Sequence, residues 1–231
     1  MQQYKNIFID LDRTLWDFET NARDTLKDIF DMHELSREEG VSFDKFLQTY
    51  QSVNHQLWEI YRQGKIIKSY LSVERFRKTL DLLGLDEGKA SQIASAYLEW
   101  SPQKTKLFPG VIETLDYLKP AYSMYIVTNG FNEVQFKKIA NSGLSSYFTK
   151  VITSDNAGHK KPDLDFFHYA FHETGVQAAE TLMIGDDYEV DIEGAQRAGM
   201  DQVFVNYEKR EIAGTAPTHE VQHFSELQKI L

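Results

Sequence analysis

The chain has 231 residues, 42% of them hydrophobic, which is enough for one large domain or for a core with a smaller companion. It contains no cysteine, which excludes disulfides, thiolate metal sites and a thiol nucleophile and fits a reducing compartment. A formal net charge of −10 argues against a nucleic-acid polymer as partner, so an anionic substrate would need local positive charge at its site.

The first element is a short apolar strand, Tyr4–Ile9, that ends in two acids, Asp10 and Asp12. Because alternate side chains of an extended segment point the same way, both carboxylates are expected to project into one space at the end of the strand. Like charges this close repel unless a cation lies between them or one carboxylate holds a proton. The alternative is a turn in which the two acids only satisfy backbone donors at the start of the next helix.

Residues 17–102 show helical spacing almost throughout and no convincing strand, which predicts an inserted all-helical cap of four or five helices. Turns are expected near Gly64, Gly84 and Gly88. The predicted domains are therefore a catalytic core of residues 1–16 and 103–231 and a cap of residues 17–102. Because both junctions are expected at the carboxyl end of the sheet, the cap is interpreted as a lid over the acidic site.

From residue 103 onward, short apolar runs alternate with helical patterns, which is typical of an α/β fold with a parallel sheet wrapped by crossover helices. With the first strand, the sheet has five or six strands. The further strands are expected at 124–128, 151–153, 182–184, 203–205 and 220–222, and the helices at 110–119, 131–142, 163–174 and 189–198.

Polar residues follow each of these strands, and in an open α/β sheet ligands bind at the carboxyl ends of the strands. They are Thr128, Asn129 and Gly130 after the second strand, His159, Lys160 and Lys161 after the third, and Asp186, Asp187 and Asp191 after the fourth. Two carboxylate clusters, a hydroxyl group and a lysine are therefore expected to converge, and His159 is expected to face solvent.

Oxygen ligands without histidine or thiolate suit Mg²⁺. Asp10, Asp186 and the backbone carbonyl of Asp12 are the predicted ligands, while Asp191 either takes a direct or indirect part in holding the metal or caps a helix. A metal there offsets the repulsion between the acids and lets a phosphate approach them. The sequence therefore predicts a magnesium-dependent site for a phosphate group.

Each polar group has a predicted chemical role. Asp10 can attack phosphorus and form an aspartyl-phosphate, and Asp12 can protonate the leaving alcohol and later take a proton from water. Thr128 and backbone donors near Asn129 and Gly130 would hold the phosphoryl oxygens, while Lys161 balances the charge on Asp10.

In this order the four segments resemble motifs I to IV of the haloacid dehalogenase-like hydrolase superfamily, over the chain from Asp10 to Asp191. The resemblance implies a Rossmann-like core, a helical cap inserted after the first motif, Mg²⁺ dependence and phosphomonoester hydrolysis. It favours Lys161 over Lys160, because the superfamily lysine usually precedes a proline. Arg13 stands where the superfamily often has glycine, and it either attracts phosphate or forms a surface ion pair.

Four segments are most similar to the branch of pyrimidine 5′-nucleotidases that clear noncanonical nucleoside monophosphates, namely 54–58, 64–66, 74–76 and 107–110. The resemblance implies a small phosphorylated metabolite as substrate, specifically a nucleoside monophosphate. Aromatic residues at helical spacing are more often core than ligand contacts. The candidates for contact with the substrate are nevertheless Trp16, Phe18, Trp58 and Arg75, with Asn54 and Lys68 as comparable choices.

Several alternatives stay open. A phosphosugar phosphatase or phosphomutase has the same four motifs. A 2-haloacid dehalogenase is disfavoured because a halide leaves carbon without taking up a proton, so an acid such as Asp12 would have no function. A silent binding module is disfavoured because every catalytic position is filled. The short, acidic start and the lack of a run of 18 apolar residues predict a cytoplasmic protein without a membrane span, as a monomer or homodimer.

Overall fold

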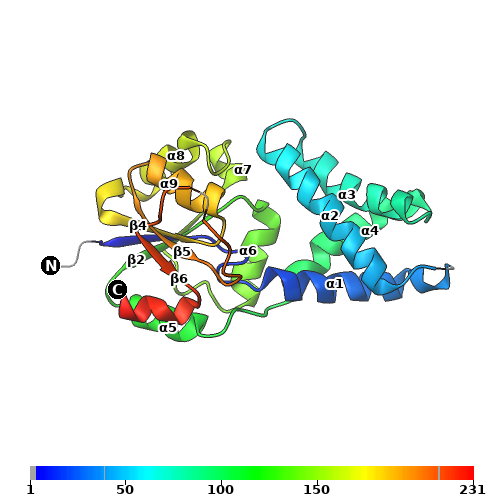
Figure 1. The fold of residues 1–231 in the computed structure, drawn as a ribbon, viewed down its shortest axis with the longest axis horizontal. Coiled ribbons are helices and arrows are strands. Elements are labelled where there is room, and N and C mark those ends of the chain that lie inside the picture. The colour runs from blue at the N-terminus through cyan, green and yellow to red at the C-terminus, as the bar shows by residue number, and fades with distance from the viewer. Residues whose placement is uncertain (1–3, 39, 213) are drawn as a thin grey trace. The chain divides into compact units, whose positions relative to one another are not determined.

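The computed structural model describes residues 4–38, 40–212 and 214–231, which divide into two compact units (Figure 1). The core unit is Met1–Phe18 with Thr105–Leu231, and the helical unit is Glu19–Lys104. The assignment of these units as a catalytic core and a lid stays a prediction.

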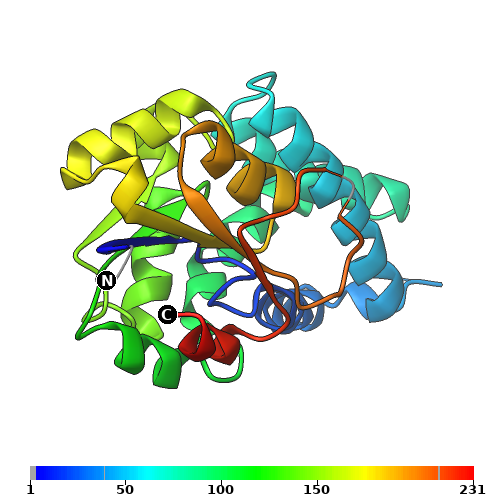
Figure 2. The ribbon, with the colours of Figure 1, turned by 60° about the vertical axis from the view of Figure 1, so that its left-hand side comes forward.

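A six-stranded sheet in the order β3-β2-β1-β4-β5-β6 forms the centre of the core unit, and every neighbouring pair is parallel (Figure 2). The strands are β1 (Asn6–Ile9), β2 (Ser123–Thr128), β3 (Lys150–Thr153), β4 (Thr181–Gly185), β5 (Asp201–Val205) and β6 (His219–Val221). The predicted α/β fold with a Rossmann-like sheet is confirmed. The strand order reverses between β1 and β4, and ligands bind at the carboxyl edge at such a point.

Helices cover both faces of the sheet, and its strands are therefore buried on both sides. Ile7 and Ile9 of β1 pack on one face with helices that follow in the chain, while Phe8, between them, packs on the other. The first face carries α5 (Val111–Leu118), α6 (Asn132–Asn141) and the 3₁₀ helix η6 (Phe224–Lys229), and the second carries α8 (Leu164–Thr174) and α9 (Gly194–Arg197).

Two short helical elements precede these last helices at the strand ends. The short helix α7 (Ser154–Ala157) follows β3 directly, and its capping residue Thr153 accepts a hydrogen bond from the Asn156 N–H. After β4, the predicted helix over 189–198 is a π-helical turn, η5 (Tyr188–Glu193), followed by α9. Asp187 caps η5, because its Oδ1 accepts from the Val190 N–H at 3.1 Å.

Helices alone make up the regular structure of the described part of the helical unit. Its core is rich in aromatic rings: Tyr50 stacks on Phe76 with the ring centroids 5.1 Å apart. Gly64, with a φ of 71°, lets the chain turn after α2, a conformation that favours glycine. The elements are α1 (Phe18–Met32), η1 (Leu35–Arg37), α2 (Phe43–Arg62), α3 (Lys68–Leu82), η2 (Glu87–Lys89), α4 (Ala90–Trp100) and η3 (Ser101–Gln103).

Candidate active site

A buried lysine connects two buried acids at the carboxyl edge of the sheet. Lys161 Nζ donates to Asp10 Oδ1 at 2.7 Å, to Asp191 Oδ1 at 2.6 Å and to the carbonyl oxygen of Val127 at 2.8 Å. Because an ammonium group has three protons to donate, Lys161 is fully bonded in this position. The structure therefore brings Lys161, rather than its neighbour Lys160, to the first acid.

Three buried carboxylates lie close together here. Asp10, Asp186 and Asp191 each offer an oxygen within 4.8 Å of the other two. Burial raises the pKa of Asp10 to about 7, although Lys161 lowers it, and burial likewise raises the pKa of Asp186 and Asp191. An all-oxygen group of carboxylates that destabilise one another's ionised forms fits Mg²⁺ well.

Asp186 and Asp191 differ in what their oxygens contact. Both oxygens of Asp191 accept from protein donors, Oδ1 from Lys161 and Oδ2 from the Asp187 N–H at 3.2 Å. Gly185 makes room for it, because a Cβ there would lie 2.3 Å from Asp191 Oδ2. Asp186 accepts on Oδ1 from Thr14 Oγ1 at 3.1 Å. Asp191 is therefore interpreted as holding Lys161 in place, and Asp186 as the better candidate for a metal ligand.

The lysine loop is attached to the end of β2 through Asn129. Its side-chain Nδ2 donates to the carbonyl oxygen of Lys161, and its Oδ1 accepts from the Lys161 N–H, both at 2.8 Å. The side chain of Asn129 thus positions Lys161. A contact between substrate and the backbone near Asn129 stays a prediction.

Thr128, the last residue of β2, has a hydroxyl oxygen that accepts two hydrogen bonds. One comes from the Gly130 N–H at 3.0 Å and the other from Gln135 Nε2 at 2.7 Å. A hydroxyl oxygen can accept two hydrogen bonds and the hydroxyl group can donate one. Because both acceptor positions are filled, Thr128 can still donate its proton to another acceptor. This arrangement suits the predicted contact between Thr128 and a phosphoryl oxygen.

Asp12 is bound by two residues that the sequence analysis did not identify. Gln135 Nε2 donates to Asp12 Oδ2 at 2.8 Å, and Lys138 Nζ donates to Asp12 Oδ1 at 2.6 Å. Both donors come from α6 and are buried. The available signal was their spacing of three, which places two polar residues on the same side of the helix as Val134 and Ile139.

Arg13 and Trp16 lie beside the first motif. Arg13 has a φ of 68°, the conformation in which glycine is least strained, and its guanidinium lies 4.3 Å from the centroid of the Phe18 ring. Trp16 belongs to the hydrophobic core of its unit, with Lys138 Nζ 3.9 Å from its ring centroid. The predicted stacking of Trp16 on a base needs an open ring face, and Lys138 occupies one.

The other substrate candidates lie in the helical unit. Arg75 is buried there, with Nη1 donating to Asn54 Oδ1 at 3.2 Å and its guanidinium 5.1 Å from the centroid of the Phe76 ring. Trp58 is half-buried and packs edge-on against Tyr61. Lys68 is half-buried at the start of α3. Their contacts with a substrate stay predictions.

Two further residues near the acids carried no recognisable sequence signal. Arg210, after β5, donates from Nη2 to the carbonyl oxygen of Asp186 at 2.7 Å. Tyr207 donates its hydroxyl proton to the carbonyl oxygen of Thr14 at 3.0 Å and stacks on Phe108. The segment after β5 therefore supports both acidic strand ends.

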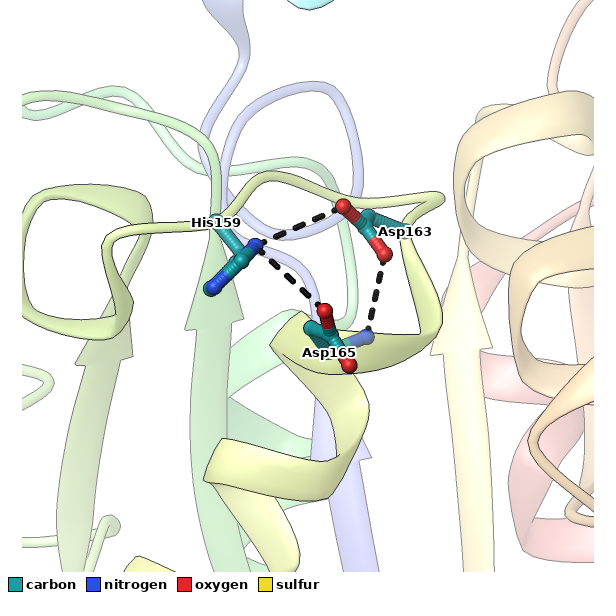
Figure 3. Close-up of side chains that lie close together, drawn as sticks. All are labelled: His159, Asp163 and Asp165. Carbon is teal, nitrogen blue, oxygen red and sulfur yellow. Dashed lines mark hydrogen bonds and ion pairs between the residues drawn. The ribbon is translucent and has the colours of Figure 1, made fainter.

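His159 faces solvent, as expected, and lies with two exposed acids before and within the first turn of α8 (Figure 3). Its Nδ1 is 3.4 Å from Asp163 Oδ2 and 3.9 Å from Asp165 Oδ2. Asp163 also caps α8 by accepting from the Asp165 N–H at 3.1 Å. Helix capping accounts for the position of this acid.

An open parallel sheet with buried aspartates after its first and fourth strands, at the edge where ligands bind, is typical of a class of α/β hydrolases. The model of the haloacid dehalogenase-like hydrolase family matches residues 4–199, and the chain belongs to this family. It is therefore an enzyme of the hydrolase class.

Individual relatives cover almost the whole chain. The pyrimidine 5′-nucleotidase PynA of Streptococcus pneumoniae is 33% identical over 97% of this chain and 93% of its own, and the pyrimidine 5′-nucleotidase YjjG of Escherichia coli is 30% identical over 97% and 96%. The crystal structure of the HAD-hydrolase YfnB of Bacillus subtilis bound to magnesium superposes with a TM-score of 0.88, at 28% identity over 99% of this chain and 98% of that one.

Across residues 4–38, 40–212 and 214–231, no helix combines the length and the apolar character that crossing a bilayer requires.

Proposed function

We propose that this chain is a phosphomonoesterase that hydrolyses nucleoside 5′-monophosphates, with pyrimidine nucleotides preferred, through an aspartyl-phosphate on Asp10. The observation that carries the proposal is the different environment of the two acids. Asp10 is bonded to the buried Lys161, while Asp12, two residues later, is bonded to donors of α6. Two relatives named pyrimidine 5′-nucleotidases support the substrate class.

The first half-reaction transfers the phosphoryl group to the protein. A carboxylate oxygen of Asp10 attacks phosphorus, the bond from phosphorus to the ester oxygen breaks, and its electron pair stays on that oxygen. Asp12, in its protonated form, gives its proton to the same oxygen, so the nucleoside leaves as a neutral alcohol. Lys161 stays bonded to Asp10 and keeps this nucleophile in one orientation.

The second half-reaction returns the protein to its starting state. Asp12, now a carboxylate, takes a proton from water while the water oxygen attacks phosphorus. The bond between phosphorus and Asp10 breaks, which regenerates the Asp10 carboxylate, the protonated Asp12 and inorganic phosphate. Thr128 donates its hydroxyl proton to a phosphoryl oxygen in both steps, because its acceptor positions are already filled.

Asp10, Asp186 and the backbone carbonyl of Asp12 are the groups that would hold Mg²⁺. When bound, the ion supplies positive charge that stabilises the phosphoryl oxygens and offsets the repulsion between the acids. Within the described residues, no N–H group donates to the Asp12 carbonyl oxygen, which leaves that oxygen available as a ligand.

The experiment that tests the substrate class is a phosphate-release screen with the purified full chain and Mg²⁺. We expect UMP and TMP to be hydrolysed in preference to purine nucleotides and hexose phosphates, and EDTA to abolish the activity. A clear preference for hexose phosphates would instead assign a phosphosugar phosphatase. Release of chloride from a 2-chloroacid, without phosphate release, would refute phosphoester hydrolysis altogether.

Replacing Asp12 with asparagine tests its role in proton transfer. We expect kcat/KM for UMP, whose leaving group is a poorly stabilised alkoxide, to fall by about 10²- to 10⁴-fold. The rate of phosphoenzyme formation from p-nitrophenyl phosphate should fall far less, because p-nitrophenolate leaves without a proton. Single-turnover kinetics with both substrates make the comparison, and equal losses on the two would contradict an acid role for Asp12.

A further inference from the structure

We propose that Gln135 and Lys138 are positioning residues for Asp12: they hold its carboxyl group in the orientation from which it exchanges protons with the leaving group and with water. This inference rests on the proposed function, because it assigns to two residues of α6 a part in the chemistry of Asp12. It adds to the four motifs a fifth element, the Gln-x-x-Lys pair of the helix that follows the second motif.

The geometry of the pair is specific to Asp12. Gln135 and Lys138 are three residues apart, so they lie on one face of α6, and each donates to a different oxygen of the same carboxylate. Two donors on two oxygens fix both the position of the carboxyl group and the rotation of its plane. A single donor would leave that rotation free.

Gln135 also connects Asp12 to the phosphate-binding end of β2. Its Nε2 donates to Asp12 Oδ2 at 2.8 Å and to Thr128 Oγ1 at 2.7 Å. One amide group therefore sets the spacing between the residue proposed to exchange protons and the hydroxyl proposed to bind a phosphoryl oxygen. Such spacing matters because proton transfer requires the heavy atoms to lie within hydrogen-bond distance.

The second motif makes room for this amide. A Cβ at Gly130 would lie 2.0 Å from Gln135 Nε2, so a side chain at this position would displace Gln135. The φ of Gly130 is not positive, so its backbone conformation does not by itself demand glycine. The side chain of Gln135 occupies the space beside Gly130.

Both residues are buried at a cost that packing alone does not explain. Gln135 is 0% and Lys138 3% exposed, and Gln135 Oε1 has no hydrogen-bond partner among the residues that the structure describes. A buried amide oxygen without a partner and a buried ammonium are each unfavourable compared with an apolar side chain of the same size. An apolar residue at either position could not donate a hydrogen bond to Asp12, and this donation accounts for the burial of two polar side chains.

Lys138 is further confined by the aromatic rings beside it. Its Nζ lies 3.9 Å from the centroid of the Trp16 ring and 5.5 Å from that of Phe18. Ring faces attract a cation without accepting its protons as a carboxylate does. The ammonium group is therefore held against Asp12, with which it forms an ion pair when Asp12 is in the carboxylate form.

The test compares two substrates on the same protein sample. Gln135→Met and Lys138→Met remove the donors but keep unbranched side chains of similar length. For each variant we expect kcat/KM for UMP to fall by roughly 10- to 100-fold, and that for p-nitrophenyl phosphate by no more than a few-fold. Because the ratio of the two values is independent of the fraction of folded protein, partial unfolding cannot produce this result.

Ile139→Val is the matched control, since Ile139 is a buried residue of α6 without polar contacts in its side chain. It should lower thermal stability slightly and leave the ratio of the two kcat/KM values unchanged. If Gln135→Met and Lys138→Met lower both activities equally, or leave both unchanged, the pair has only a structural role and the inference is wrong.

A double-mutant cycle separates this inference from the proposed function. In an Asp12→Asn background, Lys138→Met should cause no further loss on UMP, because Lys138 donates to Asp12 and, unlike Gln135, has no bond to Thr128. Full additivity of the two losses would overturn the inference alone. If Asp12→Asn itself leaves the ratio unchanged, the acid role of Asp12 is refuted, and the proposed function fails independently of Gln135 and Lys138.

Discussion

Asp10→Asn should abolish turnover of every phosphomonoester, with a loss in kcat of at least about 10⁴-fold. An amide oxygen is a poor nucleophile, and the product of its attack would not be the acyl phosphate that water cleaves. The fold should persist, because asparagine has nearly the same shape and its Oδ1 can still accept from Lys161. Phosphate release from UMP in the presence of Mg²⁺ measures the loss.

Asp116→Asn is the matched control for this substitution. Asp116 is exposed on α5 and accepts a hydrogen bond from Tyr147 at 2.8 Å, away from the strand ends. It should keep wild-type kinetics. Acid-quenched samples of the wild type should carry substrate phosphorus on Asp10, identified by peptide mass, and those of Asp10→Asn should carry none. Near-normal hydrolysis by Asp10→Asn would refute a covalent intermediate on this residue.

Lys161→Met should damage both stability and activity. Removing the ammonium leaves Asp10 and Asp191 buried without their common partner, and breaking a buried ion pair on one side costs about 3–5 kcal/mol. We expect urea unfolding to show a loss of this size in the free energy of unfolding. Activity of the folded fraction should fall by about 10²- to 10³-fold, because Asp10 loses the donor that orients it.

Lys160→Met provides the comparison. Lys160 is half-buried and adjacent in sequence, and its replacement should change the free energy of unfolding by no more than about 0.5 kcal/mol, as is usual for surface substitutions. If Lys160→Met and Lys161→Met have equal effects on stability, the buried hydrogen bonds of Lys161 are not the source of the loss.

The architecture could be predicted because it depends on local patterns. Apolar runs of strand length separated by helical periodicity are sufficient to predict a parallel sheet, and even the short run at 220–222 corresponds to a strand, β6. The principal difference lies after β4, where the predicted helix is divided into a π-helical turn and α9. That difference depends on how Asp187 and Asp191 are bonded, which periodicity does not report.

The strand-end residues were predictable for a related reason. Carboxyl ends of parallel strands meet at one edge, so Asp10, Thr128 and Asp186 had to approach one another once the strands were located. Lys161 follows β3 through a longer loop, and its choice over Lys160 came from family resemblance. What the sequence lacks is the set of contacts that fix these side chains.

Gln135 and Lys138 illustrate this limit. A glutamine and a lysine three residues apart on a helix are ordinary surface residues in most chains. Their significance appears only when the helix is placed against β1 and β2, so that both face Asp12. Arg210 is a similar case, because its contact with Asp186 crosses 24 residues of chain.

The paired hydrogen bonds between Asn129 and Lys161 have a consequence for how the molecule tolerates change. In this pair, the side-chain amide of Asn129 makes two hydrogen bonds to the backbone of Lys161, of the kind that a peptide group of a neighbouring strand would make. Lys161 is thereby attached to the end of β2 as well as to the chain that leads to it. A substitution at Asn129 would therefore change the position of the Lys161 ammonium group, although the two residues lie 32 positions apart in the chain.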